Sequence, residues 1–152
     1  MKNMNEIKRE IKHLPPLARQ RAEKSLGIAT PQNEHKVFVY GTLLSGERNA
    51  HWAKDARRTP AWTQGSLYDT GCGFPAFVKE GERKIVGELL TVNDDGFQSM
   101  DRLEGYPRLY NREQVEVITS HGHRVRAWVY IMNRLPNAAK PIENGDWRNR
   151  NA

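Results

Sequence analysis

The stretch KVFVYGTLL at Lys36–Leu44 combines the pattern of a buried strand with an abrupt turn. β-Branched and aromatic residues predominate in its first half, which predicts a buried β-strand over Lys36–Tyr40. Gly41 then lets the backbone turn sharply and lets a ligand approach closely. The backbone N–H groups beyond it could bind a carboxylate or an oxyanion, although an ordinary strand-to-helix loop has the same pattern.

Strands dominate the sequence downstream of this turn. The patterns predict strands at Thr63–Tyr68, Phe77–Val78, Lys84–Val92, Tyr110–Thr119 and Arg124–Met132. Turns are expected at Glu80–Arg83 and at His121–Gly122, and the tail from Asn133 is expected to be mostly loop. A short helix is expected at Glu47–Ala56, and a second one starts at Asp94 or Asp95 and ends at Gly105. Hairpin spacing favours antiparallel pairing, which could close a barrel.

The composition of 152 residues, 38% of them hydrophobic, suits one globular domain, expected over residues 36–152. Residues 1–35 read as a helical extension and linker. Asn3 or Asn5 is expected to cap a helix that runs to about His13, and a second helix is expected over residues 17–26.

The distribution of charged and apolar residues argues against nucleic acids and membranes as binding partners. Most of the net charge of +6 falls on residues 1–36, and the remainder of the chain is nearly balanced. A solvated helix surface accounts for this better than a nucleic-acid-binding arm, because no zinc-finger, helix-turn-helix or RNP pattern accompanies it. No run approaches the ~20 apolar residues of a membrane span, and the N-terminus lacks the apolar core of a secretory signal. We therefore expect a cytoplasmic protein without membrane or nucleic-acid partners. The oligomeric state stays open.

The segment DGFQSMDRLEGYPRLY at Asp95–Tyr110 holds the main candidate for chemistry. On a helix, Phe97, Met100 and Glu104 share one face, so Glu104 should point inward with the two apolar residues. Burial and the negative end of the helix dipole would both raise its pKa towards the range useful for acid/base catalysis. An exposed glutamate at a helix end is the ordinary alternative, and Asp101, three residues earlier, is a competing candidate.

Other reactive residues form weaker patterns. The single cysteine, Cys72, lies between glycines without an evident histidine nearby, which favours a structural role. His121 and His123 bracket a turn and lack further ligands, so no metal site is expected. Glu88 alternates with apolar residues, so it could face the interior beside Glu104 or pair with an arginine.

Four stretches, in order, resemble the γ-glutamylcyclotransferase-like proteins, in particular the AIG2-like branch that includes γ-glutamylamine cyclotransferase. They are FVYGTLL at 38–44, GELLTV at 87–92, MDRLEGYPRLYNR at 100–112 and IENGDWR at 142–148. Met100 stands where the family usually has leucine, and residues 1–34 lie outside the pattern. The resemblance implies an α+β fold, a small mixed and mainly antiparallel β-barrel flanked by helices.

The resemblance also implies a site and a reaction. Glu104 matches the catalytic acid/base, and Tyr130 matches a pocket tyrosine. The backbone that holds the γ-glutamyl group matches Tyr40, Gly41, Thr42 and Leu43. The implied enzyme releases 5-oxoproline and an amine from a small γ-glutamyl substrate, and its scheme requires no metal or other cofactor. The alternatives are a non-catalytic small-molecule-binding or regulatory module of the same fold and a basic RNA- or partner-binding protein that uses residues 1–36.

Overall fold

The computed structural model describes residues 33–151 and six isolated upstream residues, Asn3, Glu6, Pro15, Leu17, Ala18 and Arg21. The chain divides into two compact units, Met1–Gln32 and Asn33–Ala152. In the first unit, Asn3 Oδ1 accepts a hydrogen bond from the Glu6 amide at 2.9 Å, a contact typical of a helix N-cap. Most of the two helices predicted for this unit lies outside the described residues.

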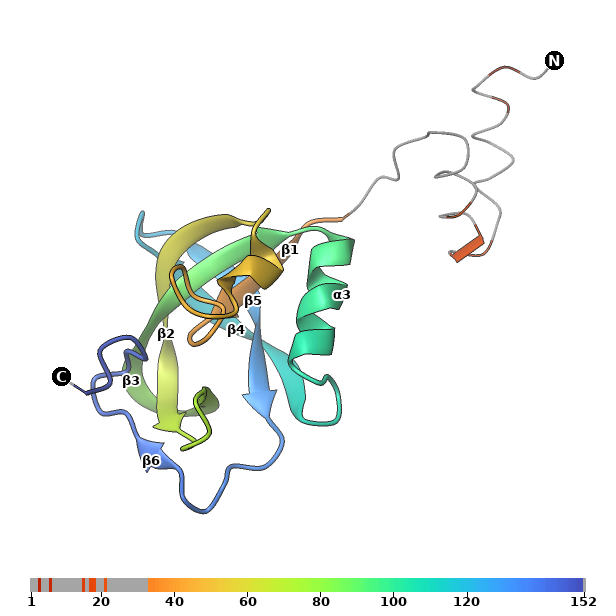
Figure 1. Ribbon diagram of the computed structural model, residues 1–152. Coiled ribbons are helices and arrows are strands. Elements are labelled where there is room, and N and C mark those ends of the chain that lie inside the picture. The colour runs from red at the N-terminus through yellow and green to blue at the C-terminus, as the bar shows by residue number, and fades with distance from the viewer. Residues whose placement is uncertain are drawn as a thin grey trace. The chain divides into compact units, whose positions relative to one another are not determined.

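The second unit contains a closed five-stranded barrel (Figure 1). Its strands are β1 (His35–Val39), β2 (Arg57–Asp69), β3 (Pro75–Val92), β4 (Tyr110–Thr119) and β5 (Arg124–Met132). They are hydrogen-bonded in the order β3-β1-β5-β4-β2, and β2 pairs back with β3 to close the barrel. The β1–β5 pair is parallel and the other pairs are antiparallel. The predicted mixed, mainly antiparallel barrel is confirmed.

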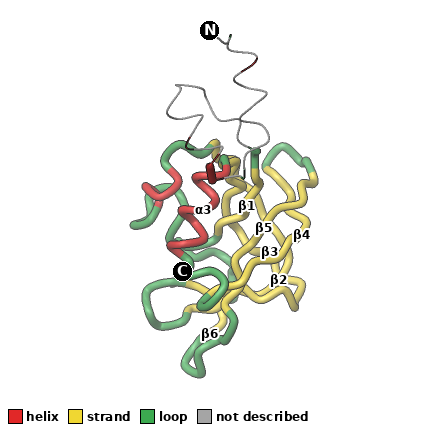
Figure 2. The backbone as a smooth tube through the Cα atoms, turned by 90° about the vertical axis from the view of Figure 1, so that its right-hand side faces the viewer, coloured by secondary structure: helices red, strands yellow, loops and turns green. Residues whose placement is uncertain are grey.

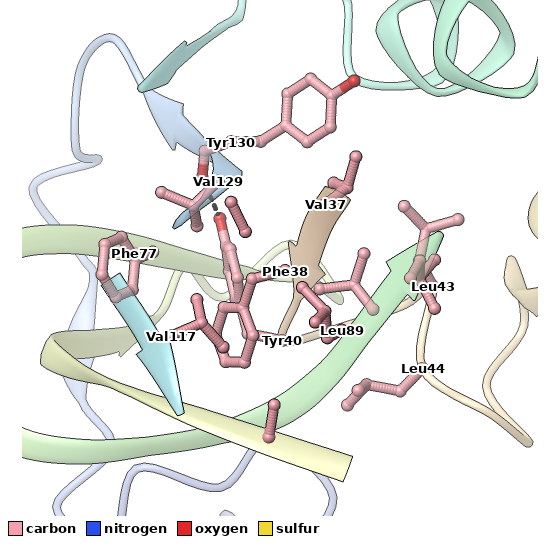
Figure 3. Packing of buried hydrophobic residues seen from close by; sticks show 14 of the residues in the cluster. Val37, Phe38, Tyr40, Leu43, Leu44, Phe77, Leu89, Val117, Val129 and Tyr130 are labelled. Atoms are coloured by element: carbon pink, nitrogen blue, oxygen red, sulfur yellow. Dashed lines mark hydrogen bonds between the residues drawn. The ribbon is translucent and has the colours of Figure 1, made fainter. Parts of the chain in front are cut away.

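The first strand lies at the centre of the core. β1 has β3 on one side and β5 on the other, and Val37 and Phe38 are fully buried. Figure 3 shows these side chains packed with Val117 and Val129 from the strands around them. The strand was predicted over Lys36–Tyr40. It begins and ends one residue earlier, at His35 and Val39.

The β2–β3 pair differs most from the prediction. Two separate strands were expected at Phe77–Val78 and Lys84–Val92, whereas β3 runs without a break through both. The pairing passes from Gly65–Arg83 to Ser66–Val78, so residues 79–82 have no partner and bulge out of the ladder. A bulge has the same polar, glycine-containing sequence as a turn, which explains the error. β2 is likewise longer than the predicted Thr63–Tyr68.

The last two barrel strands, β4 and β5, have the predicted bounds and join through the predicted turn at His121–Gly122. The tail is mostly loop as expected, apart from the two-residue strand β6 (Lys140–Pro141), which pairs with the end of β2.

The helical elements are shorter than the patterns indicated. Instead of a helix over 47–56, the structure has a single 3-10 turn, η1 (Ala50–Ala53). The helix α3 (Asp94–Leu103) is capped by Asn93, not by Asp94 or Asp95, and Asn93 Oδ1 accepts the Gly96 amide at 2.8 Å. This helix packs beside η1 and flanks the barrel (Figure 2). No helix among the described residues is long and apolar enough to cross a membrane.

Candidate active site

A cavity of about 230 Å³ lies between the end of β1, the end of α3 and the loop that precedes β3. Every residue that the sequence pointed to as a site residue lines it: Tyr40, Gly41, Thr42, Leu43, Glu104 and Tyr130. The barrel and the helix therefore bring together residues as much as 90 positions apart, as the hydrogen bond between Tyr40 and Tyr130 illustrates.

Glu104 is held at the end of α3 by a well-formed helix terminus. Its amide donates to the Met100 carbonyl at 2.9 Å, and Gly105 follows with a φ of 65°. The Gly105 amide donates to Arg102 O and the Tyr106 amide to Asp101 O, the paired bonds of a Schellman motif. Met100 is fully buried and Glu104 is half-buried. The helical register thus turns Glu104 towards the cavity, as the spacing predicted.

Burial raises the pKa of Glu104 from 4.5 to about 7. A carboxylate loses hydration when it leaves water, so its neutral form becomes more favourable. Within the described part of the chain, the Glu104 side chain has no hydrogen-bond or ion-pair partner. A group with these properties exchanges protons readily near neutral pH and is available to a molecule in the cavity.

Three tyrosine hydroxyls surround the cavity, and each already donates to another protein group. Tyr40 donates to the Tyr130 carbonyl at 2.6 Å (Figure 3), Tyr130 to Asp101 Oδ1 at 2.7 Å, and Tyr110 to the Pro75 carbonyl at 3.1 Å. Burial, and then neighbouring groups that include Glu104, raise the pKa of all three well above the ordinary value. These tyrosines stay neutral near pH 7, so Glu104 is the cavity group placed to titrate there.

The Tyr40–Leu43 loop lines one side of the cavity. Tyr40 and Leu43 also belong to the buried hydrophobic core. Asn49 fixes the turn, because its amide donates to Thr42 O at 2.9 Å and its Nδ2 to Thr42 Oγ1 at 3.0 Å. Among the described residues, the amides of Gly41, Thr42 and Leu43 find no acceptor, so they remain available to a ligand.

Close packing explains the glycine at position 41. A Cβ added to Gly41 would lie 2.5 Å from Pro75 Cγ and 2.7 Å from Pro75 Cδ. Pro75, the first residue of β3, therefore closes one wall of the cavity directly against the glycine backbone.

The other reactive residues lie in different environments. Asp101 forms an ion pair with Arg112 (Nε to Oδ1, 3.1 Å) and accepts a hydrogen bond from the Tyr130 hydroxyl. Unlike Glu104, the Asp101 carboxylate therefore already has partners within the described part of the chain. Cys72 is exposed. His121 and His123 lie side by side on the turn, and no cluster of three or more metal-ligating side chains occurs in the described part of the chain.

Sequence reasoning missed several cavity residues. They include Arg48, Asn49, Leu109 and Tyr110. The tyrosine after the Glu104 helix was a visible signal for a pocket wall, whereas Phe74 and Pro75 belong to the glycine- and proline-rich loop at 69–75, from which a pocket wall was expected. Nothing in the sequence indicated that Arg48 lines the cavity, because a single arginine in a polar loop is common.

Comparisons with known proteins show which family this chain resembles. The family profile "Gamma-glutamyl cyclotransferase, AIG2-like" matches residues 37–149. The chain is 35% identical to the γ-L-glutamyl-butirosin B γ-glutamyl cyclotransferase of Niallia circulans over 64% of this chain and 67% of that protein. It is 29% identical to the γ-glutamylcyclotransferase family protein YtfP of Escherichia coli K12, over 76% of this chain and 97% of that one.

A solved structure shares the fold as well. The crystal structure of YkqA from Bacillus subtilis matches with a TM-score of 0.61 and 30% identity over 77% of this chain. This chain spans only 40% of the length of YkqA. The match over most of the barrel, its loop and its helix shows that the chain belongs to the AIG2-like γ-glutamyl cyclotransferase family.

Proposed function

We propose that this chain releases 5-oxoproline and a free amine from a γ-glutamyl-amine or a γ-glutamyl-peptide, with Glu104 as the acid/base catalyst. One observation carries the proposal. A half-buried carboxylate with a pKa of about 7, without a hydrogen-bond or ion-pair partner among the described residues, lines the same cavity as a loop whose amide N–H groups have no acceptor there. Membership of the cyclotransferase family supports the reaction class.

In the proposed reaction, the α-amino nitrogen of the γ-glutamyl unit attacks the γ-carbonyl carbon of the same unit. A C–N bond forms within a five-membered lactam, and the C–N bond to the leaving amine breaks. Glu104 takes one proton from the α-ammonium group before the attack and gives it to the departing nitrogen as that C–N bond breaks. The α-nitrogen passes its second proton to the departing nitrogen by the same route, so the lactam nitrogen keeps one hydrogen, the amine leaves as an ammonium ion and Glu104 ends ionised as it began. Both reacting groups belong to one molecule, and the pocket mainly has to orient them.

The Tyr40–Leu43 loop supplies the orientation in this proposal. Its available amides bind the substrate carboxylate or the oxyanion that develops on the γ-carbonyl oxygen. The Tyr40 ring supports the loop from the core side through its hydrogen bond to Tyr130. Tyr130 in turn forms the wall between the loop and α3.

A panel of γ-glutamyl compounds tests this function. The panel contains γ-glutamyl-amino acids, γ-glutamyl-ε-lysine and γ-L-glutamyl-butirosin B, the last because the Niallia circulans relative is named for it. We expect 5-oxoproline to be released from at least one compound, as measured by mass spectrometry. Binding of these compounds by calorimetry without any 5-oxoproline would instead favour the non-catalytic binding module.

Arg48 provides a further test of substrate binding. It is the only cationic residue that lines the cavity in the described structure, and it pairs with no described carboxylate. Because the proposed substrate carries a carboxylate, Arg48→Gln is expected to raise KM by roughly fivefold, the effect of an exposed ion pair of about 1 kcal/mol. Steady-state kinetics on the best substrate of the panel measure the change.

Arg126→Gln is the matched control, since Arg126 is exposed on β5 outside the cavity. An equal rise in KM in both variants would mean that Arg48 acts only through the overall charge of the protein.

A further inference from the structure

Glu88 is a buried carboxylate that the proposed reaction does not use. It lies on β3 behind the Tyr40–Leu43 loop and is 9% exposed. Its Oε1 accepts the Ser45 amide at 2.7 Å, and its Oε2 accepts the Ser45 hydroxyl at 2.8 Å. Both carboxylate oxygens therefore hold the chain two residues beyond the loop.

Arg58, on β2, extends this contact to the loop itself. Its Nη1 donates to Glu88 Oε1 at 2.9 Å and to the Leu43 carbonyl at 2.8 Å. Its Nη2 donates to the Ala50 carbonyl at 3.2 Å. Apart from Glu88, every acceptor of this guanidinium belongs to the segment that connects β1 to β2.

Arg148 reaches the same place from the end of the chain. Its Nη2 donates to the Ser45 carbonyl at 2.8 Å and lies 3.6 Å from Glu88 Oε1. The preceding residue, Trp147, is 3% exposed and anchors this segment in the core. The GDWR sequence at 145–148, which the proposed reaction leaves without a role, thus ends in a contact to the loop.

Glu88 lies between two positive charges, and one of them, Arg58, is poorly hydrated like Glu88 itself. The side chains of Glu88 and Arg58 are 11% and 19% exposed. Burial alone would raise the pKa of Glu88, but the hydrogen bonds from Ser45 and the charges of Arg148 and Arg58 outweigh it, so the pKa is lowered. The carboxylate stays ionised at neutral pH and keeps its charge-assisted hydrogen bonds, which are stronger than neutral ones.

We propose that Glu88, Arg58 and Arg148 form a clamp that fixes the backbone of the Tyr40–Leu43 loop, so that its amides keep their position beside the cavity. Glu88 is then a positioning residue that acts through the loop and does not touch the substrate. An ion pair that only stabilised the barrel would bond to strand groups, whereas the clamp bonds to Leu43, Ser45 and Ala50. The kinetic consequence rests on the proposed function.

The test compares Glu88→Gln with Glu113→Gln in the full chain. Glu113 forms an exposed ion pair with Lys79 at 3.1 Å, does not line the cavity, and serves as the matched control. In Glu88→Gln, hydrogen exchange of the amides of residues 44–47 is expected to accelerate by about tenfold, the effect of weakening a hydrogen bond to a charged group. Exchange in the barrel strands should match the wild type. KM should rise by about tenfold while kcat changes little.

Two results would overturn the clamp: unchanged exchange at residues 44–47, or equally faster exchange throughout the barrel. If no γ-glutamyl compound yields 5-oxoproline, the proposed function fails, yet the exchange measurement still decides on the clamp. Should Glu88→Gln fail to fold, Arg148→Gln replaces it, because that side chain is 41% exposed. Faster exchange confined to the same residues is expected there too, and its absence would count against the proposal.

Discussion

Replacing Glu104 with Gln is expected to lower kcat for 5-oxoproline release by about 100- to 10,000-fold, the contribution of a positioned acid/base group. Glutamine has nearly the same shape, so the cavity should keep its form, but an amide cannot carry the proton from the α-ammonium group to the leaving nitrogen. KM should change little, because no contact that holds the substrate is removed. Steady-state kinetics on the best γ-glutamyl substrate provide the measurement.

The control is again Glu113→Gln, the same chemical change at an exposed position. A Glu104→Gln enzyme with wild-type turnover would remove Glu104 from the mechanism. The engaged carboxylate of Asp101 would then have to be tested as the alternative.

The pH profile of the wild-type enzyme gives the same prediction a second readout. Glu104 must be ionised to accept the first proton, and its pKa in the free protein is about 7. Therefore kcat/KM should rise with pH through about 7, and this step should vanish in Glu104→Gln. A step that persisted in the variant would assign the titration to another group.

The stability of Glu104→Gln should change in the opposite sense to its activity. The folded-state pKa of Glu104 is about 7 and the ordinary value is 4.5, so ionisation of this group opposes folding. The free energy of unfolding of the wild type should fall as pH rises between these values, by at most about 3 kcal/mol. The variant should therefore unfold at a higher temperature than the wild type at about pH 8, and at a similar one at about pH 4.

Gly87→Ala is expected to destabilise the fold by more than about 4 kcal/mol, enough to unfold much of the protein. A Cβ on Gly87 would overlap the carbonyl oxygen of Val39 and lie 2.8 Å from the Phe38 ring. Neither can give way, because Phe38 is fully buried and Val39 pairs with Glu88 in the β1–β3 ladder. Urea denaturation followed by circular dichroism measures the loss.

Gly122→Ala is the control for this second variant. Gly122 lies in the β4–β5 turn with a φ of 81° and has open space around its Cα, so only backbone strain of about 1–2 kcal/mol is expected. If Gly87→Ala were no less stable than this control, the close approach of β1 to β3 would not be what requires glycine.

Local patterns in the sequence predicted the elements whose structure depends on near neighbours. The alternation of apolar and polar residues and a glycine-containing turn correctly predicted the bounds of β4 and β5. The prediction succeeded because a hairpin depends on residues close together in the chain. The inward position of Glu104 followed from helical spacing in the same way. The predictions failed at β3, where the pairing of residues 79–82 depends on β2 and not on their own sequence.

Other features depend on contacts between distant segments. The sequence allowed two positions for the Glu88 side chain, one beside Glu104 and one paired with an arginine. The structure places it against Arg58 and Arg148. Arg48 and Tyr110 reach the cavity only because the barrel closes. No spacing rule connects such positions, since the chain between them folds through several strands.

The sequence by itself determined that a strand ends in a glycine turn, that an acidic side chain faces inward at a helix end, and which family these motifs resemble. Only the tertiary structure decided that both lie in one cavity, that Glu104 has no side-chain partner in the described part of the chain, and that its pKa is about 7. Periodicity determines which way a side chain points within its own element. Burial and partners, which control proton affinity, depend on what the rest of the chain packs against that side chain.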